Sequence, residues 1–99
     1  MRKWYHEDYR FRIEVVQVGN TNKANECRLG FEPGDVFECE YGTPAEFCPC
    51  TFMMLFPFLQ VVRCGGDLRN IGAAGSQELT LTCPDGVVTF KVTCAQNSE

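Results

Sequence analysis

Alternating apolar and polar side chains mark four short segments of the chain as half-buried β-strands. Residues 9–18, 35–41, 78–83 and 88–94 each place apolar side chains at every second position, with charged or polar side chains between them. A period of two is typical of a strand with one face against a core. The turn sequence Pro84-Asp85-Gly86 separates the last two segments, which predicts that they form a hairpin.

The longest apolar segment, residues 51–62, has the spacing of a helix instead. We expect this helix to begin at Pro49, with Cys48 as its N-cap, because proline is favoured in the first helical turn. A start at Pro44 is the alternative, but Pro49 would then interrupt the first turns. Gly65-Gly66 provides the C-terminal stop, and Pro57 should kink the helix. Its expected core residues are Phe52, Met53, Met54, Leu55, Phe56, Leu59 and Val62.

The order of these elements, β-β-α-β-β, predicts an α+β fold. A largely antiparallel sheet of about four strands would be covered on one face by the Pro-kinked helix. The chain has 99 residues, which is enough for one core. We therefore expect an N-terminal extension (1–8), a single domain (9–94) and a C-terminal tail (95–99), while the order of the strands within the sheet stays open.

Charge and hydropathy exclude two classes of partner. The net charge of −4 and a pI near 4.9 oppose binding to nucleic acid, because few cations are present to displace counterions from phosphates. The apolar run is about a dozen residues long and contains a proline, so it is too short to span a bilayer. Residues 1–20 lack the apolar core of an export signal. We therefore expect a cytoplasmic protein without a membrane partner, whose thiols stay reduced.

Three of the seven cysteines lie at structural joints. Cys27 precedes a glycine-containing loop, Cys83 precedes the Pro-Asp-Gly turn, and Cys48 caps the helix, where the unpaired N–H groups and the helix dipole favour a thiolate. Together with Cys50, two residues after Cys48, they could give a metal three or four sulfur ligands. We therefore predict a zinc or iron–sulfur site at Cys27, Cys48, Cys83 and Cys50. The remaining cysteines, Cys39, Cys64 and Cys94, are expected to fill the core.

These observations favour a small cytosolic accessory protein with a thiolate site that binds metal. The alternative is a metal-free interaction module or small subunit that associates through a sheet edge or through Trp4 and Tyr5, with a protein partner or as a homo-oligomer. A thiol enzyme with Cys48 as nucleophile is the third hypothesis. The lone His6 has no partner motif, and no paired carboxylates mark an acid–base site, so catalysis is not expected.

The pattern of cysteines, glycines and prolines resembles that of a family of short prokaryotic proteins without an assigned function. The resemblance covers about residues 11–93 and implies that Cys27, Cys48 and Cys83 belong to a shared pattern, while the other four cysteines are particular to this chain. The chain departs from the family at Phe31, where the family tends to have histidine after glycine, and it lacks an acidic stretch with tryptophan before the third strand. The matching positions are Cys27-x-x-Gly30-x-x-x-Gly34-Asp35-x-Phe37, Cys48-Pro49, Pro57, Arg63-x-Gly65-Gly66, and Cys83-Pro84-Asp85 with Val88 and Phe90.

Overall fold

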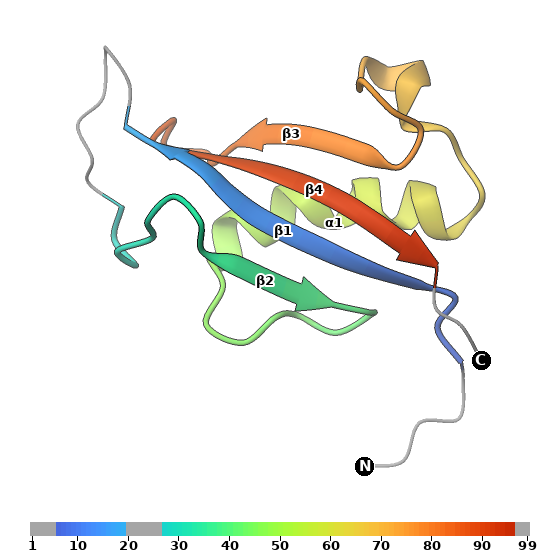
Figure 1. The fold of residues 1–99 in the computed structure, drawn as a ribbon, viewed down its shortest axis with the longest axis horizontal. Helices are drawn as coiled ribbons and strands as arrows, with labels where there is room; N and C mark the ends of the chain where they lie inside the picture. The colour runs from blue at the N-terminus through green and yellow to red at the C-terminus, as the bar shows by residue number, and fades with distance from the viewer. Residues whose placement is uncertain (1–5, 20–26, 97–99) are drawn as a thin grey trace.

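The computed structural model describes residues 6–19 and 27–96 and confirms the predicted α+β fold. Trp4 and Tyr5 lie outside the described residues. The elements follow the predicted order, with a short 3₁₀ helix added after the α-helix (Figure 1). They are β1 (Tyr9–Val18), β2 (Val36–Cys39), α1 (Pro49–Arg63), η1 (Leu68–Ile71), β3 (Glu78–Thr82) and β4 (Val88–Gln96).

The sheet is antiparallel, with the strand order β2-β1-β4-β3. Its centre is the pair of β1 with β4, in which Ile13 lies opposite Val92 and Tyr9 lies opposite Gln96. The predicted hairpin between β3 and β4 is confirmed, and Gly86 in its turn adopts a φ of 74°. Only glycine reaches this left-handed conformation without strain. The structure thus supplies the strand order that the sequence left open.

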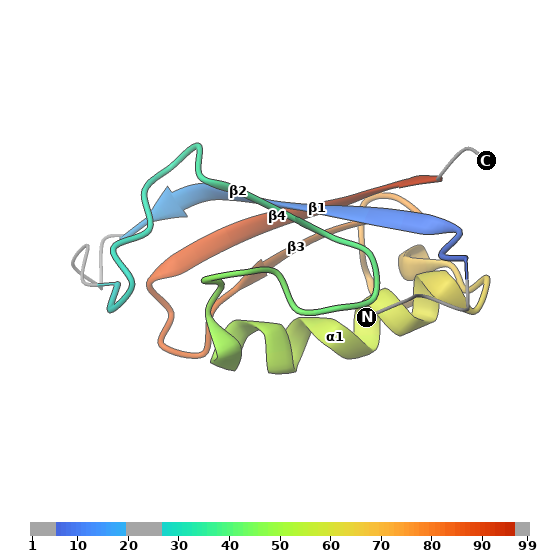
Figure 2. The ribbon, with the colours of Figure 1, turned by 90° about the horizontal axis from the view of Figure 1, so that it is seen from below.

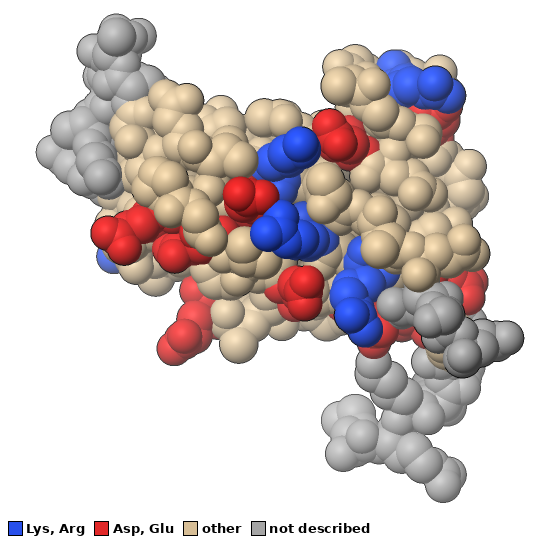
Figure 3. Space-filling view, in the orientation of Figure 1, with Lys and Arg blue, Asp and Glu red and all other residues tan. Residues whose placement is uncertain are grey.

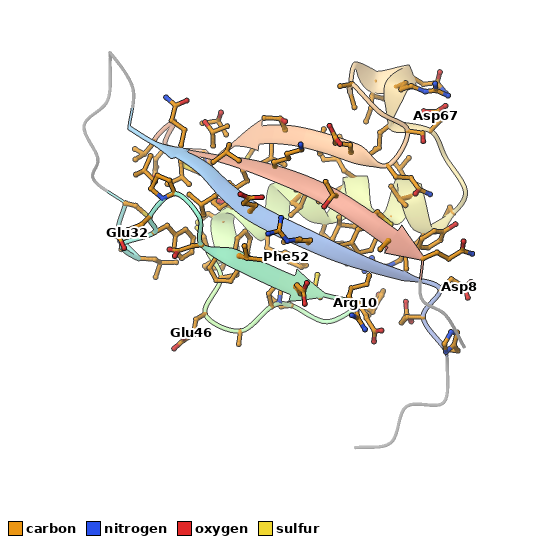
Figure 4. The ribbon with its side chains drawn as sticks, in the orientation of Figure 1. Asp8, Arg10, Glu32, Glu46, Phe52 and Asp67 are labelled. Atoms are coloured by element: carbon orange, nitrogen blue, oxygen red, sulfur yellow. The ribbon has the colours of Figure 1, made fainter. Side chains whose placement is uncertain are left out.

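The core lies between one face of the sheet and α1 (Figure 2). Alternate residues of β1 point inward and are fully buried, as the period of two requires. Phe52, labelled in Figure 4, belongs to the α1 side of this core. At the end of the molecule where α1 begins, four rings with centroids 5.0 to 6.1 Å apart fill the space under the sheet: Phe31, Phe37, Phe47 and Phe90.

Four strand boundaries differ from the predicted ones. Two differ by one residue, since β2 begins at Val36 and not at residue 35, and β3 ends at Thr82 and not at residue 83. β2 ends at Cys39 and not at residue 41, because the chain turns away toward α1, where the Glu40 carbonyl oxygen accepts a hydrogen bond from Arg63. β4 continues beyond residue 94 to Gln96, because β1 provides pairing partners to its very first residue. The predicted starts of β1 and α1 are confirmed.

The predicted burial of Met53, Met54 and Cys64 is wrong. Met53 is 79% exposed, Met54 is 40% exposed, and Cys64 is also exposed. The reason is that α1 has apolar residues around most of its circumference, whereas the sheet covers only one side of it (Figure 2). Within the described residues, no helix combines the length and apolar character needed to cross a membrane.

Candidate functional site

Cys48 is the N-cap residue of α1, as the sequence predicted. Its backbone is extended, with φ −70° and ψ 117°, and Pro49 follows in the first turn. The first helical hydrogen bond runs from the Phe52 N–H to the Cys48 carbonyl oxygen, at 3.0 Å. Proline fixes the helix start here because its ring presets φ and its missing N–H would have no partner in any case.

The surroundings of Cys48 lower the pKa of its thiol. Partial burial has the largest single effect and raises the pKa, and the negative charge of Asp85 raises it slightly further. The Thr51 hydroxyl and the N–H groups of Thr51 and Cys50 lie at the helix start, where they favour the thiolate, and together they outweigh both effects. The Thr51 side chain is fully buried and makes no hydrogen bond of standard geometry within the described residues, so its hydroxyl can be donated to a thiolate.

The other predicted metal ligands lie near this end of the molecule without forming a metal site. The segment that starts at Cys27, the start of α1 and the β3–β4 turn share one end of the fold (Figure 2). Cys27, Cys48 and Cys83 all pack against the core, the Cys83 sulfur accepts a hydrogen bond from the Val88 N–H at 3.4 Å, and Cys50 is exposed. Within residues 6–19 and 27–96, no three His, Cys, Asp or Glu side chains are grouped to hold a metal ion. The metal site stays a prediction.

Two of the cysteines expected in the core are packed there. Cys39 on β2 and Cys94 on β4 both lie opposite Phe11 of β1, and both pack against the core. Burial raises the pKa of each thiol, and the positive charge of Arg63 only partly opposes this effect. They are therefore poor thiolates, in contrast to Cys48.

Arg63, in the last turn of α1, is a site that sequence reasoning missed. Its side chain is only 12% exposed, and its guanidinium lies 4.9 Å from the ring centroid of Phe11 and 5.0 Å from that of Tyr41. It also donates hydrogen bonds to the Glu40 carbonyl oxygen and to Gln60 Oε1. A basic residue at a helix C-terminus is only a weak sequence signal for a buried site, and most of the groups that Arg63 contacts lie on segments distant along the chain. Arg63 ties the end of α1 to the chain after β2.

The outer face of α1 is the second feature that the sequence did not identify. We use this term for the exposed or half-exposed side chains on the side of α1 away from the sheet. The sequence has no charged residue between Pro49 and Val62, so this face is uncharged along most of the helix. Its members are Cys50, Met53, Met54, Pro57, Gln60, Cys64 and Val61, of which Val61 is half-buried and also packs against the core.

The open face of the sheet has the opposite character. It carries interspersed positive and negative side chains (Figure 3), including the ion pair of Arg12 with Glu14 at 2.7 Å and that of Lys91 with Glu78 at 3.9 Å. Such a mixed charged surface is well hydrated and typical of a face that stays in water. The two sides of this molecule therefore differ, with one polar and one apolar.

Comparison of the chain with protein-family models, with curated proteins and with solved structures finds no match. The resemblance to a prokaryotic family therefore stays an expectation.

Proposed function

We propose that the protein is a small accessory subunit or interaction module that binds another protein surface through the outer face of α1. The observation that carries this proposal is the exposure of Met53, at 79%, and Met54, at 40%, on a helix without charged residues between Pro49 and Val62. Contiguous apolar surface of this kind marks interaction sites in soluble proteins. Methionine suits such a surface because its flexible, polarisable side chain adapts to a partner.

The sheet offers less for binding a protein than the outer face of α1. The open face of the sheet is charged, and its apolar exposure is limited to single side chains such as Val16, which is 42% exposed. The edge strands β2 and β3 have four and five residues, and short edge strands are one way in which proteins prevent strand addition. The helix is therefore favoured over the sheet edge as the interaction site.

Thiol chemistry at Cys48 is a second candidate function, favoured by one specific observation. The helix start and the buried Thr51 hydroxyl lower the pKa of this thiol, and a thiolate is the reactive form of cysteine. Reaction with an electrophile or coordination of a metal by Cys48 with Cys27, Cys83 and Cys50 would use this property. Elemental analysis of protein purified without air tests the metal hypothesis directly, since stoichiometric zinc or iron would support it and metal-free protein would contradict it.

The proposed interaction is tested by charging the outer face of α1. Met53→Glu places a carboxylate in the middle of this face, and glutamate is a good helix former, so the fold should be preserved. Val16→Glu is the matched control, because it charges an exposed apolar position on the other side of the molecule. The affinity-tagged full chain and both variants are expressed in the source cells, and the proteins recovered with each are quantified by mass spectrometry. Thermal unfolding followed by circular dichroism verifies that both variants fold.

We expect a binding protein, which includes a second copy of the chain, to be recovered with the wild type and with Val16→Glu. The same protein should be lost with Met53→Glu. Equal recovery with all three chains would contradict the proposal, and so would the absence of any specifically recovered protein.

A further inference from the structure

We propose that the partner of the outer face of α1 is a second copy of this chain, with the two α1 helices antiparallel and a two-fold axis near Pro57. This inference rests on the proposed function, because it names the occupant of the same surface. Two properties of the face support it, the spacing of its residues and its charge, and the size of the face sets how strongly the two copies associate.

The spacing of the exposed residues is symmetric about Pro57. Cys50 lies seven residues before Pro57 and Cys64 lies seven after it, while Met53 lies four before and Val61 four after. In a two-fold interface, if residue i contacts residue j, then j also contacts i. An axis near Pro57 therefore places Cys50 opposite Cys64 of the second copy and Met53 opposite Val61 of the second copy. The same axis places Met54 opposite Gln60 of the second copy, so that Gln60 is the one polar side chain among these pairs.

Five residues of the outer face also have the spacing of a helix–helix seam. Cys50, Met53, Pro57, Gln60 and Cys64 follow the alternating steps of three and four residues by which two helices pack side by side at a small angle. Gln60 is the one polar member, and its side chain already accepts a hydrogen bond from Arg63 at 2.5 Å. Contact with a second helix would therefore leave no carboxylate or ammonium group buried.

Charge favours this face over the open face of the sheet for contact between copies. Each chain carries a net charge of −4, so two copies repel each other, and contact is least unfavourable where neither contributes charges. The outer face of α1 meets this condition along the stretch between Pro49 and Val62. The antiparallel arrangement also places the positive N-terminal end of one helix dipole beside the negative C-terminal end of the other.

The size of the face predicts a weak dimer. From Cys50 to Cys64 the face is about 21 Å long, at 1.5 Å per residue, and it is one helix wide. Such a contact is smaller than the roughly 800 Å² per partner of a standard stable interface. We therefore expect association that depends strongly on protein concentration.

The test combines sedimentation velocity with chemical crosslinking of the natural cysteines. The wild-type chain is measured over a range of concentrations, and then treated with a bismaleimide whose spacer spans less than half of the distance between Cys50 and Cys64. Because about 21 Å separate these residues along one helix, a Cys50–Cys64 crosslink can form only between two chains. Tryptic digestion releases Cys64 in the short peptide of residues 64–69, and fragment spectra then identify its partner.

We expect a concentration-dependent dimer and a Cys50–Cys64 crosslink, which Cys50→Ser removes. Met53→Glu should weaken the dimer at least about tenfold, because the carboxylate would lose its hydration against Val61 of the second copy. Val16→Glu should leave the dimer unchanged.

A wild-type chain that stays monomeric at every concentration would overturn the inference. A dimer with only Cys50–Cys50 and Cys64–Cys64 crosslinks would overturn the antiparallel arrangement, and a dimer unaffected by Met53→Glu would overturn the interface. If the chain is monomeric but a different protein is recovered with the wild type and lost with Met53→Glu, the second copy is wrong and the proposed function stands. If Met53→Glu changes neither result, both fail.

Discussion

Arg63 should contribute more to stability than any other charged side chain described above, and Arg63→Met isolates this contribution. Methionine retains an unbranched apolar stem of similar length but removes the charge and all five N–H donors. The native guanidinium lies within 5.0 Å of the Phe11 and Tyr41 ring centroids and donates to the Glu40 carbonyl oxygen. The substitution therefore removes contacts among α1, β1 and the chain after β2 simultaneously.

The expected loss can be estimated from these contacts. A largely desolvated cation–π contact stabilises by about 1 to 2 kcal/mol, and a hydrogen bond from a charged donor by about 1.5 to 3 kcal/mol. Methionine fills part of the space and removes the cost of burying the guanidinium, which offsets part of the loss. It also removes a partner of the Glu7 carboxylate, which lies 3.9 Å from Arg63 Nε and is 15% exposed, and this adds to the loss. We expect the free energy of unfolding to fall by about 2 to 3 kcal/mol. For a domain of this size, that lowers the melting temperature by about 10 to 20 °C.

Urea unfolding followed by circular dichroism measures this change, with Arg69→Met as the matched control. Both arginines form an ion pair, Arg63 with Glu7 at 3.9 Å and Arg69 with Asp67 at 2.7 Å, but the side chain of Arg69 is 64% exposed. Exposed pairs contribute about 0 to 1 kcal/mol, so Arg69→Met should change the unfolding free energy by at most about 0.5 kcal/mol. The unfolding free energy of Arg63→Lys should lie between those of Arg63→Met and Arg69→Met, since lysine retains the charge but loses the planar donor group. If Arg63→Met is no less stable than Arg69→Met, the reasoning about this site is refuted.

Three further predictions concern the thiols and the core. Cys48 should be alkylated at lower pH than Cys39 and Cys94, because its pKa is lowered and theirs are raised. Thr51→Val should raise the apparent pKa of the Cys48 labelling without loss of stability, since it removes a buried hydroxyl that lacks a standard partner; an unchanged labelling profile would contradict the role of Thr51. Burial raises the pKa of Cys39 and Cys94 above the ordinary value of 9.0, so the stability that these thiols contribute is present below that pH and is lost as the pH rises through their folded pKa values. The measurement uses Cys48→Ser, because the lowered pKa of Cys48 acts on stability in the opposite direction. The urea midpoint of this variant should fall in alkaline solution, and a constant midpoint would exclude this linkage. Leu55→Ala should cost about 2 to 5 kcal/mol in urea unfolding, because Leu55 is fully buried between α1 and the sheet, and a cost below about 1 kcal/mol would show that α1 does not pack there.

The sequence was sufficient to predict the strands and the helix because each has a local signal. The alternation in residues 9–18 and the Pro49 helix start depend only on neighbouring residues. The exposure of Met53 and Cys64 could not be predicted, because an apolar helix does not reveal how many of its sides the rest of the chain covers. Helical spacing identifies the buried stripe only when polar residues occupy the other sides, and α1 lacks them.

The prediction of the cysteine and arginine sites was limited because both depend on contacts between segments that are distant along the chain. The sequence correctly associated loops and turns with Cys27, Cys48 and Cys83, and these segments share one end of the fold. Whether the three sulfur atoms lie close together depends on the directions of side chains from separate segments. Arg63 contacts the Glu40 carbonyl oxygen and the Phe11 ring, both far away along the chain. No periodicity in the sequence encodes such a contact.

The strand order has a consequence for how the chain folds. β1 and β4, the first and last strands described, form the central pair of the sheet, so its middle closes only after Gln96 has left the ribosome. During synthesis β1 can pair with β2, but its other edge stays open until the hairpin of β3 and β4 arrives. Pairings between such distant segments slow folding and prolong the exposure of an apolar strand edge. The nascent chain should therefore be most prone to aggregation between the completion of α1 and the release of β4.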